Sequence, residues 1–165
     1  MEHLSRRRAM QTVAAAIAPL AIRLDAAPQQ PAPAARRLGP YAAAVLPAGI
    51  RSRFVDDITG LRMHVLEAGF EPQGRPAVVM LHGFPELAYS WRKVMPAIAA
   101  AGFHVVAPDL RGYGRTSGTE VTFDDDLAPF RTLNEVRDIV GLVSAFGYRS
   151  VVAVIGHDFG SPVAA

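Results

Sequence analysis

Short apolar runs recur along the chain. They are rich in β-branched residues and are bounded by glycine, proline or polar residues, a pattern that predicts strands buried on both faces. Helix-like segments separate them, and this alternation indicates parallel strands joined by right-handed crossovers. We therefore predict the α/β fold class, with a mostly parallel sheet and helices on both faces. Residues 77–81 and 104–107 are the two runs expected to be buried strands, and residues 151–155 are expected to form a final apolar strand.

A strand pattern of another kind precedes these runs. Leu61, Met63 and Val65 alternate with polar residues after a turn-like segment at residues 57–60, which ends in Thr-Gly. This pattern predicts a β-hairpin, because apolar side chains two apart lie on the same face of a strand. We place the start of ordered structure near Arg51.

Two helices are expected between the strands. The first covers residues 91–101, is broken or restarted at Pro96, and ends at Gly102. The second starts with a capping box at residues 132–135, in which Thr and Glu satisfy free N–H groups, and ends at Gly147. The apolar positions predicted to share one face of this helix are Leu133, Val136, Ile139, Val140, Val143 and Phe146.

The first forty residues have the composition of a leader and a spacer. Three arginines at residues 6–8 precede an uncharged stretch at residues 9–22, which is too short for a stable membrane span. This order resembles a twin-arginine export signal, and the alternative is a disordered tail. Residues 28–40 are rich in Pro and Ala, which is typical of a linker. We assign residues 1–40 to export signal and linker, and expect an exported, periplasmic or extracellular protein, with a cytoplasmic location as the alternative.

Charge is divided unevenly along the chain. Residues 1–50 carry six Arg against two acidic residues, whereas residues 51–165, the expected folded core, carry eleven basic and thirteen acidic residues. The core is mildly acidic, and no nucleic-acid partner is expected because phosphate binding needs a clustered basic face. The chain has no cysteine, which excludes disulfides and thiolate metal sites.

Two further motifs favour structural roles over ligand binding. Residues 112–117 almost match a dinucleotide-binding fingerprint, but the last glycine is missing and no helix opens there. Asp109 and Arg111 are expected to brace this loop as a hydrogen-bonded pair. The three aspartates at residues 124–126 are expected to be solvated, because consecutive acids seldom converge on one ion. We expect no cofactor and no metal.

A candidate nucleophile follows the last apolar run. Residues 156–160 have the sequence Gly-His-Asp-Phe-Gly, and glycines two residues either side of Asp158 permit a tight strand-to-helix turn that exposes the central side chain. Aspartate has a reference pKa of about 3.9, so it is ionised at neutral pH and needs no base for its own attack. Attack on a saturated carbon with a leaving group gives an alkyl ester, which activated water must hydrolyse. The alternative is an ordinary aspartate in a glycine turn.

A second loop is expected at the same edge of the sheet. Residues 82–85, His-Gly-Phe-Pro, follow the first apolar run, and the carboxyl ends of parallel strands meet at one edge. The backbone N–H groups of Phe84 and Phe159 are therefore candidates for an oxyanion hole. His82 is expected to shape the loop without transferring protons, and His157 either lines the entrance or packs under the turn.

Four motifs stand at compatible spacing: His82-Gly-Phe-Pro-Glu86, Ser90-Trp-Arg92, Ala107-Pro-Asp-Leu-Arg-Gly-Tyr-Gly114 and Gly156-His-Asp-Phe-Gly160. In this order they resemble the α/β-hydrolases of the epoxide hydrolase type, over about residues 50–165. The resemblance implies a nucleophile at Asp158, backbone oxyanion donors at Phe84 and Phe159, and a cis bond before Pro85. Members of that family usually have Trp where this chain has Phe159.

The resemblance also implies a substrate class. A small hydrophobic epoxide or related electrophile is expected, with His82, Pro85 and His157 as substrate-binding residues. Dehalogenases of the same fold are the alternative enzymes. Haloalkane dehalogenases hold halide with Trp and Asn side chains where this chain has Phe159 and Phe84, which donate no such bond. Haloacetate dehalogenases place arginines beside the nucleophile, and this chain has none there.

The chain positions the nucleophile close to its last residue. In the α/β-hydrolase order an acid and a histidine follow the nucleophile, and residues 159–165 contain neither. We therefore expect residues 51–165 to be the N-terminal part of a hydrolase core without its cap domain. The alternative is a truncated, non-catalytic fragment or pseudoenzyme.

Overall fold

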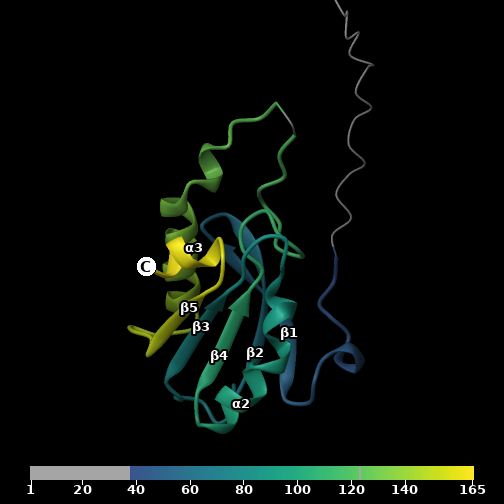
Figure 1. Cartoon of the computed structure of the whole chain (residues 1–165), viewed down its shortest axis with the longest axis vertical. Coiled ribbons are helices and arrows are strands. Elements are labelled where there is room, and N and C mark those ends of the chain that lie inside the picture. The colour runs from purple at the N-terminus through teal and green to yellow at the C-terminus, as the bar shows by residue number, and fades with distance from the viewer. Residues whose placement is uncertain (1–37, 123) are drawn as a thin grey trace, which may run out of the picture. The chain divides into compact units, whose positions relative to one another are not determined.

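The computed structural model describes residues 38–122 and 124–165. The expected export signal and most of the expected linker lie outside these residues. Within the described part, no helix is both long enough and apolar enough to cross a membrane. Figure 1 shows the arrangement of the elements. In chain order they are η1 (Ala43–Val45), β1 (Ile50–Ile58), β2 (Leu61–Ala68), β3 (Ala77–Leu81), η2 (Ala88–Lys93), α2 (Met95–Ala100), β4 (His104–Pro108), η3 (Ala128–Phe130), α3 (Thr132–Ala145), β5 (Ala153–Gly156) and α4 (Gly160–Ala164).

The described strands form one mixed sheet in the order β1-β2-β4-β3-β5. β1 and β2 make the expected antiparallel hairpin, and β2 also runs antiparallel to β4. β3 pairs in parallel with β4 on one side and with β5 on the other. The predicted α/β class is confirmed, and the sheet is mixed because the hairpin joins the parallel strands in the opposite direction.

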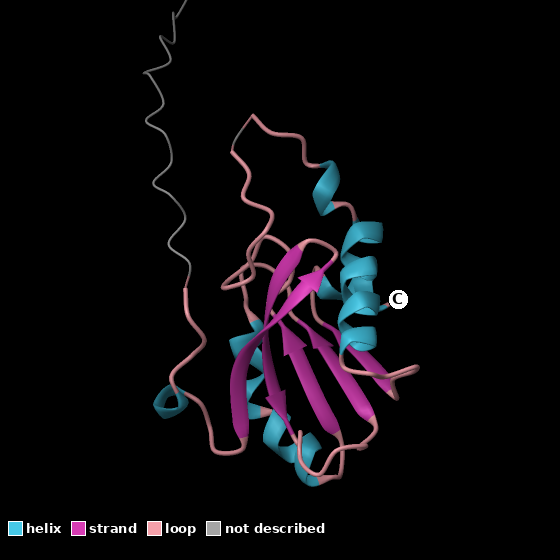
Figure 2. Ribbon diagram, turned by 180° about the vertical axis from the view of Figure 1, so that it is seen from behind, coloured by secondary structure: helices cyan, strands magenta, loops and turns pink. Residues whose placement is uncertain are grey.

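Helices cover both faces of the sheet (Figure 2). Successive side chains of a strand point to opposite faces. In β3, Val78 and Met80 belong to a buried cluster that includes Met95 of α2. Val79 and Leu81 point the other way and pack in a cluster with residues of α3 and α4. Every residue of β3 and β4 is buried, as continuous apolar runs predict for strands covered on both sides.

β5 is less buried than β3 and β4. It begins at Ala153, two residues later than the apolar run, and its residues are half-buried or exposed. Val152 is exposed, although its N–H donates to the Ala77 carbonyl at 2.8 Å. This exposure fits the position of β5 at an edge of the described sheet, with β3 as its one strand neighbour there.

Packed structure begins before the expected start near Arg51. The backbone N–H of Tyr41 donates to Ser52 Oγ at 2.8 Å. The Arg115 guanidinium lies 3.4 Å from the centre of the Tyr41 ring, and its Nε donates to the Gly39 carbonyl at 3.0 Å. The segment has no strand or helix periodicity, so its sequence carried no signal for these contacts.

The helices lie close to the expected ranges, with two corrections. The expected first helix divides into the 3-10 helix η2 and α2, which begins at Met95 with Pro96 in its first turn. The predicted capping box is wrong, because Arg131 is the N-cap of α3 and Thr132 is already helical. Gly147 ends α3 with a φ of 79°, the left-handed conformation that commonly stops a helix.

The buried face of α3 also differs from the prediction. Leu133 and Val140 are 65% and 63% exposed, whereas Asp138 is buried. The Asp138 carboxylate accepts bonds from Nε and a terminal nitrogen of Arg111 at 2.8 and 2.7 Å. This ion pair places Asp138 on the inner face, so the two apolar residues turn outward.

Candidate active site

Asp158 lies in a tight turn between β5 and α4. Its φ is 49°, a left-handed conformation that Asp tolerates better than most residues. A Cβ at Gly156 would collide with the backbone of Gly160, and a Cβ at Gly160 would collide with the carbonyl of Leu81. The two glycines therefore let the turn close against β3, and the Asp158 side chain is left exposed.

The loop after β3 binds this carboxylate. Parallel pairing sets Leu81 opposite Gly156, so the chain leaves β3 and β5 at the same edge of the sheet. The Phe84 N–H donates to Asp158 Oδ1 at 2.9 Å. This bond, followed in importance by a bond from the Phe159 N–H, lowers the pKa of Asp158. Both expected oxyanion donors thus point at an ionised carboxylate.

The two loops approach one another closely. A Cβ at Gly83 would collide with the side chain of Asp158, so this position requires glycine. The Phe84–Pro85 peptide bond is cis, as the resemblance implied. Pro85 is exposed beside these residues.

The two residues whose N–H groups bind the carboxylate, Phe84 and Phe159, have exposed aromatic side chains. The rings of Phe84 and Phe159 have centroids 6.4 Å apart and planes at 75°, and the residues are 63% and 60% exposed. Neither ring donates a conventional hydrogen bond, and both present apolar area. The surface beside Asp158 therefore suits apolar substrate groups.

The expected substrate-binding histidines occupy different environments. His157 is exposed, and its Nδ1 lies 3.5 Å from Glu86 Oε2. Of its two expected positions, it therefore occupies the one at the surface and does not pack under the turn. His82 is 0% exposed; its Nδ1 lies 2.9 Å from the Gly83 carbonyl oxygen, and its Nε2 accepts the Leu110 N–H at 3.0 Å. Burial lowers the pKa of His82. His82 therefore does not line the substrate-binding surface, where we expected it, because both ring nitrogens are bonded inside the fold.

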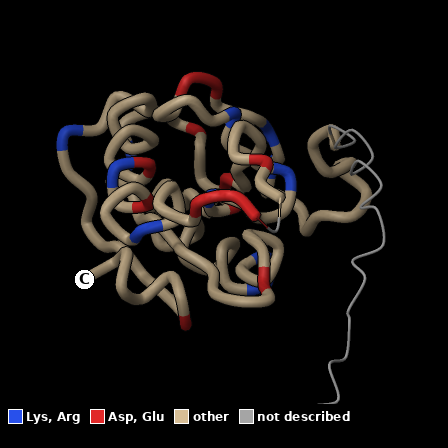
Figure 3. The backbone as a smooth tube through the Cα atoms, turned by 90° about the horizontal axis from the view of Figure 1, so that it is seen from above, with Lys and Arg blue, Asp and Glu red and all other residues tan. Residues whose placement is uncertain are grey.

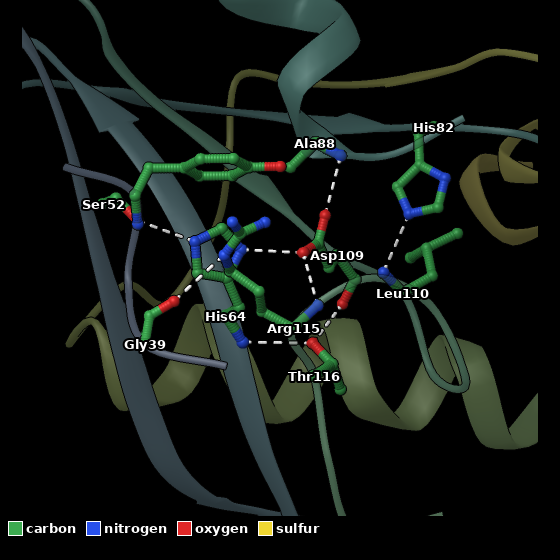
Figure 4. A network of polar contacts seen from close by, with 10 residues as sticks. Gly39, Ser52, His64, His82, Ala88, Asp109, Leu110, Arg115 and Thr116 are labelled. Carbon is green, nitrogen blue, oxygen red and sulfur yellow. Dashed lines mark hydrogen bonds and ion pairs between the residues drawn. The ribbon is translucent and has the colours of Figure 1, made fainter. Parts of the chain in front are cut away.

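A second aspartate anchors a buried polar network behind this edge of the sheet (Figure 4). Asp109 accepts bonds from His64 Nδ1 at 2.8 Å, the Ala88 N–H at 2.9 Å and the Arg115 N–H at 3.0 Å. The expected pair between Asp109 and Arg111 is wrong, because these three donors take the Asp109 oxygens and Arg111 binds a carboxylate on α3. No sequence signal pointed to the bond between His64 and Asp109, because His64 occupies only one polar position in the alternating pattern of β2.

The loop at residues 112–117, which resembles a dinucleotide fingerprint, packs against Asp109. A Cβ at Gly114 would collide with the Asp109 carboxylate, so the glycine lets the loop bring its N–H groups to that side chain. Within residues 38–122 and 124–165, no group of three or more His, Asp or Glu is placed to hold a metal.

Figure 3 shows acidic and basic positions interspersed around the described fold.

Comparisons with known proteins give this geometry a context. Residues 76–165 match the family described as alpha/beta hydrolase fold. Epoxide hydrolase A of Mycobacterium tuberculosis is 49% identical over 107 residues, which are 65% of this chain and 31% of that protein. Soluble epoxide hydrolase of Corynebacterium sp. is 46% identical over 107 residues, 65% of this chain and 33% of that protein.

Solved structures of epoxide hydrolases are also similar to this chain. Epoxide hydrolase A from Mycobacterium thermoresistibile is 42% identical with a TM-score of 0.61, covering 69% of this chain and 33% of that one. The chain spans about a third of the length of the curated relatives it matches. The family match includes both loops that meet at Asp158 and covers more than half of the sequence, and the chain therefore belongs to the alpha/beta hydrolase fold family.

Proposed function

We propose that this chain supplies the nucleophile of an epoxide hydrolase that works through a covalent ester on Asp158. One observation carries the proposal: an exposed, ionised carboxylate accepts the Phe84 N–H at 2.9 Å, beside the apolar pair of Phe84 and Phe159. Relatives named epoxide hydrolase, 42% to 49% identical over the matched residues, support the substrate class. The proposal concerns the complete protein.

In the first half-reaction an oxygen of Asp158 attacks an epoxide carbon. An ester C–O bond forms, the ring C–O bond breaks, and its electron pair goes to the ring oxygen, which takes up a proton from a donor facing the site. Because the nucleophile is ionised, it needs no base for this step. The exposed aromatic rings contact the apolar part of the substrate.

In the second half-reaction water attacks the carbonyl carbon of the ester. Negative charge develops on the former carboxylate oxygen, where the N–H groups of Phe84 and Phe159 stabilise it. Breaking the acyl–oxygen bond releases the diol and restores Asp158, so one water is consumed. A histidine that follows the nucleophile in this fold takes one proton of the water and passes it to the leaving alkoxide, and the second proton of the water returns to the donor that protonated the ring oxygen.

Heavy-oxygen water tests the covalent step. A single turnover with excess enzyme should give mostly unlabelled diol, with the label in the peptide that contains Asp158, because the transferred oxygen comes from the carboxylate. Direct attack by water would give labelled diol and an unlabelled peptide, and would refute the proposal.

A variant and a second substrate class serve as controls. Asp158→Ala should stop formation of the ester, seen as loss of the substrate-sized mass increase on the protein. Normal turnover by this variant would show that Asp158 is not the nucleophile. Faster release of halide from a haloalkane or haloacetate than of diol from an epoxide would favour a dehalogenase.

We also propose that residues 1–40 direct export. The proposal is supported by the arginine cluster, the apolar core and the Pro/Ala-rich spacer, which follow in that order. Fused to a reporter in a bacterial host, this segment should direct export, and replacement of Arg6 and Arg7 by Lys should abolish it. Cytoplasmic retention of the unchanged fusion would contradict the assignment.

A further inference from the structure

We propose that His82 is a positioning residue, which fixes the peptide group between Gly83 and Phe84 so that its N–H points at Asp158. The inference rests on the proposed function and adds how one oxyanion donor is held in place. It gives His82 no contact with substrate and no part in proton transfer.

The hydrogen bonds of His82 define its tautomer. A backbone N–H can only donate, so Nε2, 3.0 Å from the Leu110 nitrogen, carries a lone pair and no proton. In a neutral imidazole the proton then lies on Nδ1, which donates to the Gly83 carbonyl at 2.9 Å. Burial lowers the pKa of His82 and so favours this neutral ring.

The Gly83 carbonyl and the Phe84 N–H belong to the same peptide group. A peptide group is planar and resists twisting, so fixing the direction of its C=O also fixes the direction of its N–H. His82 holds the carbonyl end, and Asp158 Oδ1 lies 2.9 Å from the nitrogen at the other end. A hydrogen bond to the carbonyl also polarises the amide and strengthens its N–H as a donor.

The far side of the His82 ring is tied to the protein interior (Figure 4). Leu110, which donates to Nε2, directly follows the buried Asp109 and its network. Tyr113 packs edge-on against the ring, with centroids 5.1 Å apart. The imidazole therefore connects a rigid buried network to the loop that carries the exposed Phe84.

Two substitutions separate the two bonds of His82. Asn places a side-chain N–H near the position of Nδ1 and can keep the bond to Gly83, whereas Gln places its amide near Nε2 and can keep the bond to Leu110. We expect His82→Gln to slow hydrolysis of the Asp158 ester about 100-fold, the effect of losing one oxyanion donor, and His82→Asn to stay within about threefold of the native rate.

Rapid-quench mass spectrometry of the complete protein with styrene oxide measures formation and hydrolysis of the ester separately. The proposal is supported if His82→Gln accumulates ester while His82→Asn does not. A merely structural role would reduce the folded fraction, and so the amount of ester formed, in both variants alike without a selective slowing of ester hydrolysis, and that result would overturn the positioning role. If the native protein forms no ester at all, the proposed function itself fails.

A measurement on the native protein keeps the test independent of how the variants fold. Nitrogen NMR shifts of the His82 ring should show the proton on Nδ1 and a bare Nε2. A proton on Nε2 would remove the donor to the Gly83 carbonyl and would overturn the positioning role.

Discussion

Asp109 and Asp158 follow β4 and β5, the two strands that pair in parallel with β3, but they have opposite surroundings. Asp109 is completely buried, and its oxygens accept bonds from His64 and two backbone N–H groups. Asp158 is exposed and accepts the backbone N–H groups of Phe84 and Phe159. Burial raises the pKa of Asp109, but the hydrogen bond with His64 and its other partners outweigh burial, so both carboxyls have a lowered pKa.

The contrast shows that a lowered pKa alone does not mark a reactive carboxylate. The oxygens of Asp109 are enclosed by their donors, so an electrophile has no path to them. Asp158 combines the same ionised state with an open approach and adjacent apolar rings. Access therefore separates Asp109, which holds the fold together, from Asp158, which we propose as the nucleophile.

The largest expected effect is on chemistry at Asp158. Asp158→Asn keeps the shape of the side chain and tolerates the left-handed backbone, but an amide is a poor nucleophile. Ester formation with an epoxide should fall by about 10⁴-fold or more, while the melting temperature stays nearly unchanged. Intact-protein mass spectrometry and calorimetry measure the two effects.

The same substitution at Asp109 should act on stability instead. In either orientation, Asp109→Asn turns its amide N–H₂ toward a backbone N–H group, which can only donate, and should cost about 3–5 kcal/mol of unfolding free energy. Urea unfolding measures this loss. Equal destabilisation by the two Asn variants would break the distinction between them.

Glu67 extends the comparison to a second buried carboxylate. Burial raises its pKa, but hydrogen bonds from His104, Arg51 and Arg53 outweigh burial and lower the pKa to about 2. Because the ordinary value is 4.5, Glu67 contributes about 3 kcal/mol of stability above that pH, and this contribution is lost as the pH falls towards 2. The stability difference between native protein and Glu67→Gln should therefore shrink through this window in urea titrations. A difference that stays constant would contradict the assignment.

Gly114 tests how tightly the loop must approach Asp109. Gly114 and Gly147 both have positive φ, 56° and 79°, so alanine at either costs about 1–2 kcal/mol of backbone strain. A Cβ at Gly114 also collides with the Asp109 carboxylate, whereas nothing lies within 4 Å of one at Gly147. Gly114→Ala should be the more destabilising by at least about 1 kcal/mol in urea unfolding. Equal losses of unfolding free energy in the two variants would mean that the loop can shift to make room for the added Cβ at no cost.

The smallest effect is expected at the outer end of the buried network. Ser52 Oγ lies 2.7 Å from His64 Nε2 and accepts the Tyr41 N–H. Ser52→Ala should cost about 1 kcal/mol of stability and leave ester formation at Asp158 unchanged. A slower ester-forming step at full folding would show that the two carboxylate sites are coupled.

The local sequence pattern predicted those elements whose structure depends on residues close together in the chain. β3 and β4 could be predicted because strands buried on both faces need unbroken apolar runs. The turn at Asp158 could be predicted because Gly156 and Gly160 stand where the backbone closes on itself. The C-terminal end of α3 could be predicted because Gly147 adopts the left-handed conformation that commonly stops a helix.

Contacts between distant elements could not be predicted in this way. The donors to Asp109 come from β2, η2 and the loop after β4, and nothing in any one segment shows that they converge. Likewise, the inner face of α3 depends on the pairing of Asp138 with Arg111, so a count of apolar residues placed Leu133 and Val140 incorrectly. The pair of hydrogen bonds made by His82 could not be predicted either, because its partners, Gly83 and Leu110, lie on separate loops.

The hydrogen bond from Phe84 to Asp158 joins residues 74 positions apart in the chain. A ribosome adds about 5–20 residues per second, so several seconds pass between synthesis of the first loop and synthesis of its partner. The β1–β2 hairpin has no such delay, because its strands are joined by a short turn. β3 meanwhile has β4 as a neighbour but must wait for β5, and its unpaired edge is open to association with other nascent chains during that interval.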